Sequence, residues 1–145
     1  MPVDYSLGKV YKIVGNGKVY VGSTCERLLC QRLAGHKYKY KGWLDGKSDN
    51  VTSFECITDP DCYIELLEVC PCSCKDELRK CEGKWIRDLE CVNKMVAGRT
   101  RAEWQSSHKE SMASYQKSYR EKNRELLAEK TKAYILKKKS DQQSI

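Results

Sequence analysis

The chain has 145 residues, of which 40% are hydrophobic and 32% charged, with nine Tyr but a single Phe. This length suits one domain with an appendage and excludes two large domains, while the apolar fraction excludes a wholly disordered chain. No stretch approaches the roughly 18 apolar residues of a membrane span, and residues 1–7 lack the features of a secretory signal. We therefore expect an intracellular protein of the cytoplasm or nucleus, not secreted and not bound to a membrane.

Positive charge is concentrated towards the C-terminus. Residues 1–98 hold 15 Lys/Arg against 14 Asp/Glu, whereas residues 99–145 hold 12 against 6, within a total net charge of +7. Such a segment favours a polyanionic partner, nucleic acid first and an anionic membrane surface second, because each neutralised phosphate releases counterions. A solvated basic helix explains the charge equally well. We divide the chain into a compact domain, 1–98, and a basic helical tail, 99–145.

Residues 9–22 have the pattern of a β-hairpin. Polar and apolar side chains alternate over residues 9–14, and residues 18–22 are again rich in β-branched and aromatic side chains. The Gly-Asn-Gly sequence of residues 15–17 tolerates the positive φ angles that a tight hairpin turn requires. The pattern and the turn chemistry therefore agree.

Helical spacing begins after the hairpin. Residues 24–41 predict a helix with a short apolar stripe, in which Arg32 precedes His36 by four positions on one face. Residues 42–50 are rich in Gly, Asp and Ser and predict a loop, and for residues 51–57 we favour a short helix.

Residues 62–69 are dense in apolar side chains on both faces, which fits a central strand bounded by Pro60 and Pro71. The order hairpin, helix, strand, helix predicts an α+β fold. We expect a small three-stranded sheet, mixed or antiparallel, made of the hairpin and this central strand and flanked by helices. A basic helical extension follows it.

The second helix of the compact domain begins at Ser73, with Asp76 as its capping partner, and carries Glu82. No Gly or Pro interrupts residues 101–139, which predict one long helix or two. The narrow apolar edge of this tail consists of Met112, Tyr115 and Tyr119.

With this order of elements, the chain resembles the GIY-YIG endonuclease family over about residues 8–97. The resemblance is carried by an ordered set of residues: Tyr11 and Tyr20 in the hairpin, Arg32 and His36 in the first helix, Glu82 in the second, and Asn93. Four segments are most similar to the versions found in large DNA viruses, which would place the protein in a host cell: 20–24, 31–37, 91–94 and 97–100. Lys9 departs from the family by replacing its first Gly, and the spacer of eight residues between the two motifs is short.

The resemblance implies a metal-dependent endonuclease that hydrolyses DNA phosphodiester bonds with one divalent ion, Mg²⁺ or Mn²⁺, held by Glu82. One carboxylate is enough, because Mg²⁺ completes its octahedron with water and substrate phosphate. Arg32 offers a planar, permanently charged fork for a phosphate. Without the resemblance, the favoured explanation of Glu82 is a solvated helix residue, which is the usual fate of such residues. The alternative for Arg32 is an exposed helix salt bridge with Glu26.

The remaining roles also come from the resemblance. Tyr11 is implied as general base, although a phenol with a pKa of about 10 is a poor base at neutral pH, so a neighbour must lower that pKa. The candidates are a metal-bound water, His36 and three lysines, Lys9, Lys12 and Lys18. Tyr20 would position water or phosphate, and Asn93 would order the site through hydrogen bonds. The alternatives are tyrosines packed in the core and a His36 that points at solvent.

Two rival sites are weaker. Pro60-Asp61 followed by Glu82-Gly83-Lys84 matches the PD-(D/E)xK nuclease pattern, but that pattern needs its ExK on a strand, and here it falls within a helix. The cysteines that could bind zinc are Cys70, Cys72, Cys74 and Cys81. Zinc is disfavoured because the usual paired two-residue spacings are absent, and we expect these four to be buried apolar side chains. Among the nine cysteines of the chain we expect mostly reduced thiols.

We expect DNA as the partner. The candidate contacts are basic residues of both parts of the chain: Lys18, Lys37, Arg99, Arg101, Lys117, Arg120, Lys122 and Arg124. The alternative is a catalytically inactive nuclease fold that binds nucleic acid, against which the complete set of six site residues argues. A structural or membrane-associated protein with a basic helix comes third.

Overall fold

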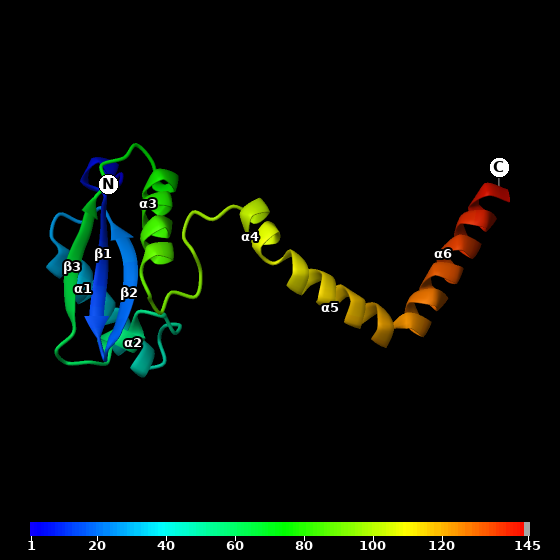
Figure 1. Cartoon of the computed structure of the whole chain (residues 1–145), viewed down its shortest axis with the longest axis horizontal. Coiled ribbons are helices and arrows are strands. Elements are labelled where there is room, and N and C mark those ends of the chain that lie inside the picture. The colour runs from blue at the N-terminus through cyan, green and yellow to red at the C-terminus, as the bar shows by residue number, and fades with distance from the viewer. Residues whose placement is uncertain (144–145) are drawn as a thin grey trace. The chain divides into compact units, whose positions relative to one another are not determined.

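The sheet of the N-terminal unit is built on the predicted hairpin. In this computed structural model, which describes residues 1–143, strands β1 (Lys9–Gly15) and β2 (Lys18–Thr24) pair antiparallel (Figure 1). Asn16 and Gly17 between them have φ angles of 55° and 68°. Tight hairpin turns need positive φ angles at both positions, and asparagine and glycine adopt them at low cost.

The third strand lies at an edge of the sheet. Strand β3 (Tyr63–Val69) pairs antiparallel with β1, so the strand order is β2-β1-β3. The predicted α+β fold with a three-stranded sheet flanked by helices is confirmed, and both strand pairs are antiparallel. The prediction that residues 62–69 form the central strand is wrong, because β1 has that place.

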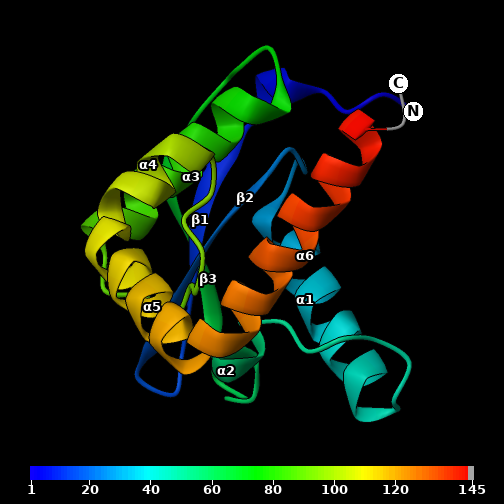
Figure 2. The same ribbon diagram turned by 90° about the vertical axis from the view of Figure 1, so that its right-hand side faces the viewer.

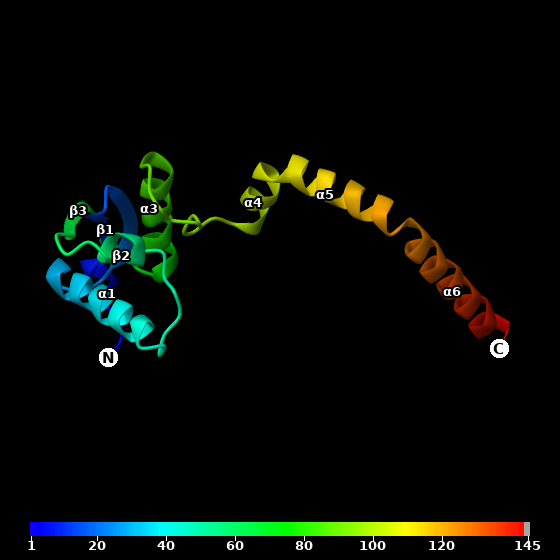
Figure 3. The same cartoon turned by 90° about the horizontal axis from the view of Figure 1, so that it is seen from below.

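Helices cover both faces of this sheet (Figure 3). They are α1 (Leu29–Leu44), α2 (Phe54–Ile57) and α3 (Lys75–Asp88), and a short 3-10 turn (Tyr5–Leu7) precedes β1. Tyr11 and Ile13 pack with α1 and α2 on one face, whereas Val10 and Val21 pack with α3 on the other. Alternate residues of β1 therefore belong to different clusters, as the two-residue period of a strand requires.

Both faces of β3 contain apolar residues because helices lie on both sides of the sheet. Ile64 packs into the cluster of Tyr11, and Leu67 into the cluster of Val10. Near the two ends of the strand, Tyr63 and Val69 are 52% and 59% exposed. A strand covered on both faces has the same sequence pattern at the centre of a sheet and at its edge, which explains the wrong prediction.

The start of α3 differs in detail from the prediction. The backbone N–H and the hydroxyl of Ser73 donate to Glu77 Oε2 at 2.8 and 3.0 Å. The capping partner of Ser73 is therefore Glu77, and the expectation of Asp76 is wrong. The helix itself begins two residues later, at Lys75.

The cysteines depart from the expected burial. Cys70 and Cys81 form a disulfide that joins the end of β3 to α3, and the other seven cysteines are free. Cys70, Cys72 and Cys81 are partly buried and Cys74 is exposed. The prediction that these four are buried is therefore wrong; the buried cysteines of the described chain are Cys56 and Cys62.

The chain divides after Arg99, and the second unit begins at Thr100. It consists of three successive helices, α4 (Arg101–Ser107), α5 (Lys109–Lys122) and α6 (Arg124–Gln143) (Figure 2). The breaks lie at His108 and Asn123. His108 Nδ1 is 2.9 Å from the Trp104 carbonyl oxygen, and Asn123 Nδ2 donates to the Tyr119 carbonyl at 2.9 Å. Each of these side chains bonds to the preceding turn and so competes with continuation of the helix, which explains three helices where one or two were predicted.

The apolar edge of the tail is open to solvent. Tyr115 and Tyr119 stack on each other with 6.4 Å between ring centroids, and they are 71% and 48% exposed. Within residues 1–143, no helix combines the length and the apolar character needed to cross a bilayer.

Candidate active site

Three of the predicted site residues form one hydrogen-bonded chain. Tyr11 on β1 contacts both Arg32 and His36, which project from α1 one turn apart. Arg32 Nε donates to the Tyr11 hydroxyl at 2.9 Å, and this hydroxyl lies 2.8 Å from His36 Nε2. His36 is 6% exposed, and its Nδ1 lies 3.0 Å from the Ser53 hydroxyl. The alternative of a His36 that points at solvent is therefore wrong.

An open cleft lies beside these three hydrogen-bonded residues. It has a volume of about 930 Å³, and the residues that line it include Tyr20, Arg32, Glu82 and Asn93. A neighbouring hollow of about 590 Å³ shares Arg32 and Glu82 with it. Four of the six predicted residues thus face the same space, although they come from β2, α1, α3 and the segment after α3.

Glu82 is a partly buried carboxylate in the wall of the cleft. Its Oε2 accepts a short hydrogen bond from the Ser23 hydroxyl. Burial raises the pKa of Glu82, and the Ser23 hydrogen bond and the charges of Arg32 and Arg79 partly oppose that rise. A desolvated carboxylate gains from a nearby cation. Glu82 is therefore not the solvated helix residue that was the alternative.

Arg32 does not pair with Glu26, which was the alternative for this residue. In the described part of the chain, no ion pair joins the two side chains. One buried carboxylate oxygen of Glu26, Oε2, has no hydrogen-bond partner there. The guanidinium of Arg32 is instead fixed through its Nε by Tyr11.

Tyr11 lies beneath the cleft and does not line it. Its side chain is fully buried, and it belongs to the wall of neither hollow. Burial raises the pKa of Tyr11 well above that of a free tyrosine, although Arg32 acts in the opposite direction. A general base must reach the attacking water and must lose its proton readily. The position and the pKa of Tyr11 both disagree with that implied role.

The lysines considered as activators of Tyr11 have other partners. Lys9 Nζ donates to two backbone carbonyls that precede α1, at 2.8 and 3.2 Å. Lys12 and Lys18 each pair with a glutamate, at 3.2 and 2.7 Å. Arg32 is the cation that opposes the rise in the pKa of Tyr11, and none of the three lysine candidates has that place.

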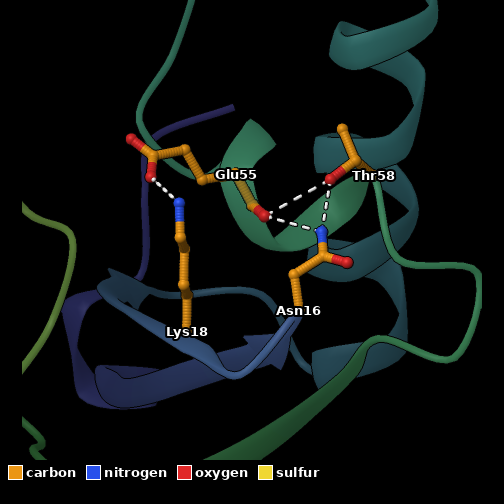
Figure 4. A network of polar contacts seen from close by, with 4 residues as sticks. All are labelled: Asn16, Lys18, Glu55 and Thr58. Carbon is orange, nitrogen blue, oxygen red and sulfur yellow. Dashed lines mark hydrogen bonds and ion pairs between the residues drawn. The ribbon is translucent and has the colours of Figure 1, made fainter.

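Figure 4 shows the surroundings of Lys18 at the hairpin turn. Lys18 Nζ bonds to Glu55 Oε2, so this predicted DNA contact has its charge paired within the protein. Asn16 Nδ2 donates to the Glu55 carbonyl and to the Thr58 hydroxyl. These bonds attach the turn between β1 and β2 to α2.

Gly22 is needed for the position of Tyr11. The two residues are opposite each other in the β1–β2 pairing. A Cβ atom at Gly22 would lie 2.6 Å from the Tyr11 hydroxyl oxygen, which is closer than real Cβ atoms approach. Any side chain at Gly22 would therefore displace the phenol from Arg32 and His36.

Tyr20 and Asn93 are linked through β2. The Tyr20 ring lies edge-on to His36 with 5.6 Å between centroids, and burial, followed by the charge of Glu82, raises the pKa of Tyr20. Asn93 accepts from the Val21 N–H at 2.9 Å and donates to the Val21 carbonyl at 2.8 Å. Since Val21 follows Tyr20, this amide holds the outer edge of the strand that presents the tyrosine to the cleft.

Three residues near the site carried no role in the sequence analysis: Ser23, Ser53 and Arg79. Arg79 lies three positions before Glu82 and lines both hollows, so helical spacing alone could have indicated it. Ser23 follows Gly22 and could have been inferred from strand alternation relative to Val21. No local pattern could have indicated Ser53, because only the fold brings it to His36.

The other predicted DNA contacts are mostly exposed. Lys37 is exposed on α1, and Arg99 lines the cleft. The remaining five are exposed residues of the tail helices: Arg101, Lys117, Arg120, Lys122 and Arg124.

Among the six predicted site residues, Glu82 is the carboxylate that could hold a divalent ion. Within residues 1–143, no group of three or more His, Cys, Asp or Glu side chains is arranged to hold a metal. Mg²⁺ does not need such a group, and a desolvated Glu82 beside an open cleft fits the predicted single ion. Cys70 and Cys81, two of the four cysteines considered for zinc, are bonded to each other. Glu82 and Lys84 both lie on α3, so the PD-(D/E)xK pattern lacks its strand.

The chain matches no protein-family model, no curated protein and no solved structure in the comparisons. Only the residues of the site therefore support a function for this protein.

Proposed function

We propose that the N-terminal unit is a metal-dependent endonuclease of the GIY-YIG type, which hydrolyses DNA phosphodiester bonds with a single Mg²⁺ or Mn²⁺ ion. The observation that supports this most is that Tyr20, Arg32 and Glu82 line one cleft although they come from three separate elements. Phosphoryl transfer requires mainly positioning and charge stabilisation. A fixed cation, a desolvated acid and a hydroxyl in one cleft can supply both.

Arg32 would bind the phosphate. Its Nε donates to Tyr11, so the two terminal nitrogens of the guanidinium would donate to two phosphoryl oxygens. A cation held in one orientation loses little freedom when the transition state forms, so its stabilising effect is large.

Glu82 would hold the divalent ion, with the Ser23 hydroxyl orienting its carboxylate. When bound, such an ion neutralises charge on the phosphate and lowers the pKa of water. Tyr20, which faces the cleft, is placed to orient the attacking water, and Asn93 keeps its strand in position.

The tail would grip the DNA backbone without taking part in the reaction. Residues 99–145 carry a net charge of +6, and the predicted basic contacts on α4, α5 and α6 are exposed. Backbone contacts of this kind position a protein on DNA without reading its sequence.

Incubation of supercoiled plasmid with the full chain tests the proposal. We expect nicked or linear DNA with Mg²⁺ or Mn²⁺ and none with excess EDTA. The second candidate is a nuclease fold that binds nucleic acid without cutting it. Retained binding in a gel-shift assay, without cleavage under any of several divalent ions, would favour that candidate and overturn the endonuclease.

A further inference from the structure

His36 has two buried hydrogen-bond partners, one on each ring nitrogen. Tyr11 is at Nε2 and Ser53 at Nδ1, and both partner residues are fully buried. Burial, with the nearby charges of Arg32 and Lys39, lowers the pKa of His36 to about 4. The imidazole is therefore neutral near pH 7 and carries one proton, so one ring nitrogen is a donor and the other an acceptor.

The partners decide which nitrogen has the proton. Arg32 Nε can only donate, so the Tyr11 oxygen accepts from it. The Tyr11 hydroxyl still has its own proton, and His36 Nε2 is the acceptor at hydrogen-bond distance. Nε2 is then unprotonated, and Nδ1–H donates to the Ser53 oxygen. All three bonds run in one direction, from Arg32 to Ser53, and bonds aligned in this way strengthen one another.

The Ser53 side chain bonds to His36 and does not cap α2. It is the N-cap residue of α2, where a serine hydroxyl commonly accepts from a backbone N–H of the first turn. Here the side chain makes no capping bond, and it is directed to His36. The contacts of Asn16 with Glu55 and Thr58 attach α2 to the hairpin turn (Figure 4). The backbone that presents Ser53 is therefore held relative to the strand of Tyr11.

We propose that Ser53 is a positioning residue: it holds His36 as the Nδ1–H tautomer, so that His36 holds the Tyr11 hydroxyl and Tyr11 holds the Arg32 guanidinium towards the cleft. Tyr11 and His36 then also act as positioning residues, and neither transfers a proton. The fully buried Tyr11, outside the wall of the cleft, agrees with this role. The effect on cleavage rests on the proposed nuclease function, whereas the tautomer does not.

The first test is independent of cleavage. In ¹⁵N NMR spectra of the full chain at pH 7, the ring nitrogens of His36 should show a proton on Nδ1 in the wild type. Ser53→Ala removes the acceptor of Nδ1–H, so the share of the Nε2–H form should rise, although the Tyr11 hydroxyl still favours Nδ1–H. An Nε2–H tautomer in the wild type, or an unchanged Nδ1–H tautomer in Ser53→Ala, would overturn the proposal even in a protein that cuts no DNA.

The second test uses single-turnover cleavage at saturating DNA and Mg²⁺. Ser53→Ala should lower the rate about ten- to a hundredfold, as loss of an orienting partner commonly does. In an Arg32→Ala background the same change should lower it no further, because there is no guanidinium left to orient. If Ser53→Ala lowers the cleavage rate by the same factor in both backgrounds, Ser53 does not act through Arg32 and the proposal is overturned. A wild type that does not cut at all would instead overturn the proposed function, with the NMR result still decisive for Ser53.

Two variants separate positioning from stability. Ser53→Thr keeps a hydroxyl at the same place and should restore most of the rate and the Nδ1–H tautomer. Phe54→Leu disturbs the same helix at its ring contacts with Tyr40 and Trp43, outside the buried cluster of Tyr11, so it should lower the melting temperature and leave the single-turnover rate unchanged. If Phe54→Leu lowers the rate as much as Ser53→Ala does, the role of Ser53 is only structural.

Discussion

The two units of the chain use polar residues in opposite ways. In Met1–Arg99, polar groups far apart in sequence are buried and bonded to one another, such as Tyr11 with His36 and Val21 with Asn93. In the helices after Thr100, by contrast, Asn123 and Thr131 bond to backbone carbonyls four positions back in the chain, and the charged residues of the described part are exposed. Buried polar groups are held in one geometry, whereas exposed cations act through their number.

This difference predicts that the rate of DNA cleavage depends on single residues of the first unit. The affinity for DNA should depend on the summed charge of the second unit. Substitutions in each unit, and removal of the second, can test whether the two properties separate in this way.

The largest effect is expected for Glu82→Ala. Loss of the ion that Glu82 would hold should lower metal-dependent cleavage by about a thousandfold or more, since a bound metal supplies several kcal/mol of transition-state stabilisation. DNA affinity should change little, because the basic tail remains. Single-turnover rates and filter binding measure the two quantities. The matched control is Asp88→Ala, which removes an exposed acid from the same helix. If Glu82→Ala cuts DNA at the wild-type rate, the single-ion site is refuted.

Arg32→Lys should be nearly as harmful as Arg32→Ala, with a loss of about a hundredfold in the cleavage rate. Lysine keeps the charge but has neither the fork for two phosphoryl oxygens nor the Nε that bonds to Tyr11. Arg87→Lys, an exposed change on α3, should be silent in the same assay. Full activity in Arg32→Lys would mean that only charge matters at this position.

Removal of residues 100–145 deletes 11 Lys/Arg and 6 Asp/Glu and should weaken DNA binding most at low salt. The slope of log affinity against log salt should fall by about 0.9 for each duplex phosphate that the protein no longer neutralises. The saturated cleavage rate should stay within a small factor, because the whole cleft lies in the first unit. An unchanged salt slope in a truncated protein that melts normally would reject the DNA grip.

Acid should destabilise the first unit through His36. Its pKa is about 4 when folded and about 6.5 when unfolded, so between these values the unfolded state binds more protons. The free energy of unfolding should therefore fall as the pH falls from about 6.5 to about 4, by at most about 1.4 kcal/mol per unit of pH from this residue. Glu82 acts in the opposite direction, because burial raises its pKa.

Denaturant titrations of the wild type and His36→Gln across this range measure the difference. The variant should lose less stability as the pH falls. Parallel curves for the two proteins would show that His36 is not neutral in the folded state.

The smallest effects are expected for a pair of glycine substitutions. Gly22→Ala places a Cβ against the Tyr11 hydroxyl and should lower the free energy of unfolding by about 1–3 kcal/mol, as overpacking does. Gly35 lies in α1, and no atom is within 4 Å of the position that a Cβ would take. Because alanine favours a helix more than glycine does, Gly35→Ala should raise the free energy of unfolding by about 0.5–1 kcal/mol. Melting in urea compares the two, and destabilisation of equal size at both sites would contradict the close approach at Tyr11.

The hairpin and the first helix of the N-terminal unit could be predicted from local patterns. Alternation over residues 9–14 and the Asn16-Gly17 turn are properties of neighbouring residues, so they need no knowledge of the rest of the chain. The four-residue spacing of Arg32 and His36 likewise places both on one helix face. Residue types and short spacings therefore determined the α+β class, whereas the candidates for the site came from the family resemblance.

The tertiary structure alone decided how those candidates are used. The apolar residues on both faces of β3 show that helices cover both faces of the sheet, and they do not show that β3 is its central strand. Burial of a face depends on what packs against it. The same limit applies to Tyr11, which the pattern places in the hairpin but which only the packing of α1 and α2 buries beneath the cleft. Ser53 and Tyr11 are 42 positions apart in the sequence, and no local rule relates them. Their connection through His36 exists because long-range packing, and not spacing, brings buried donors and acceptors together.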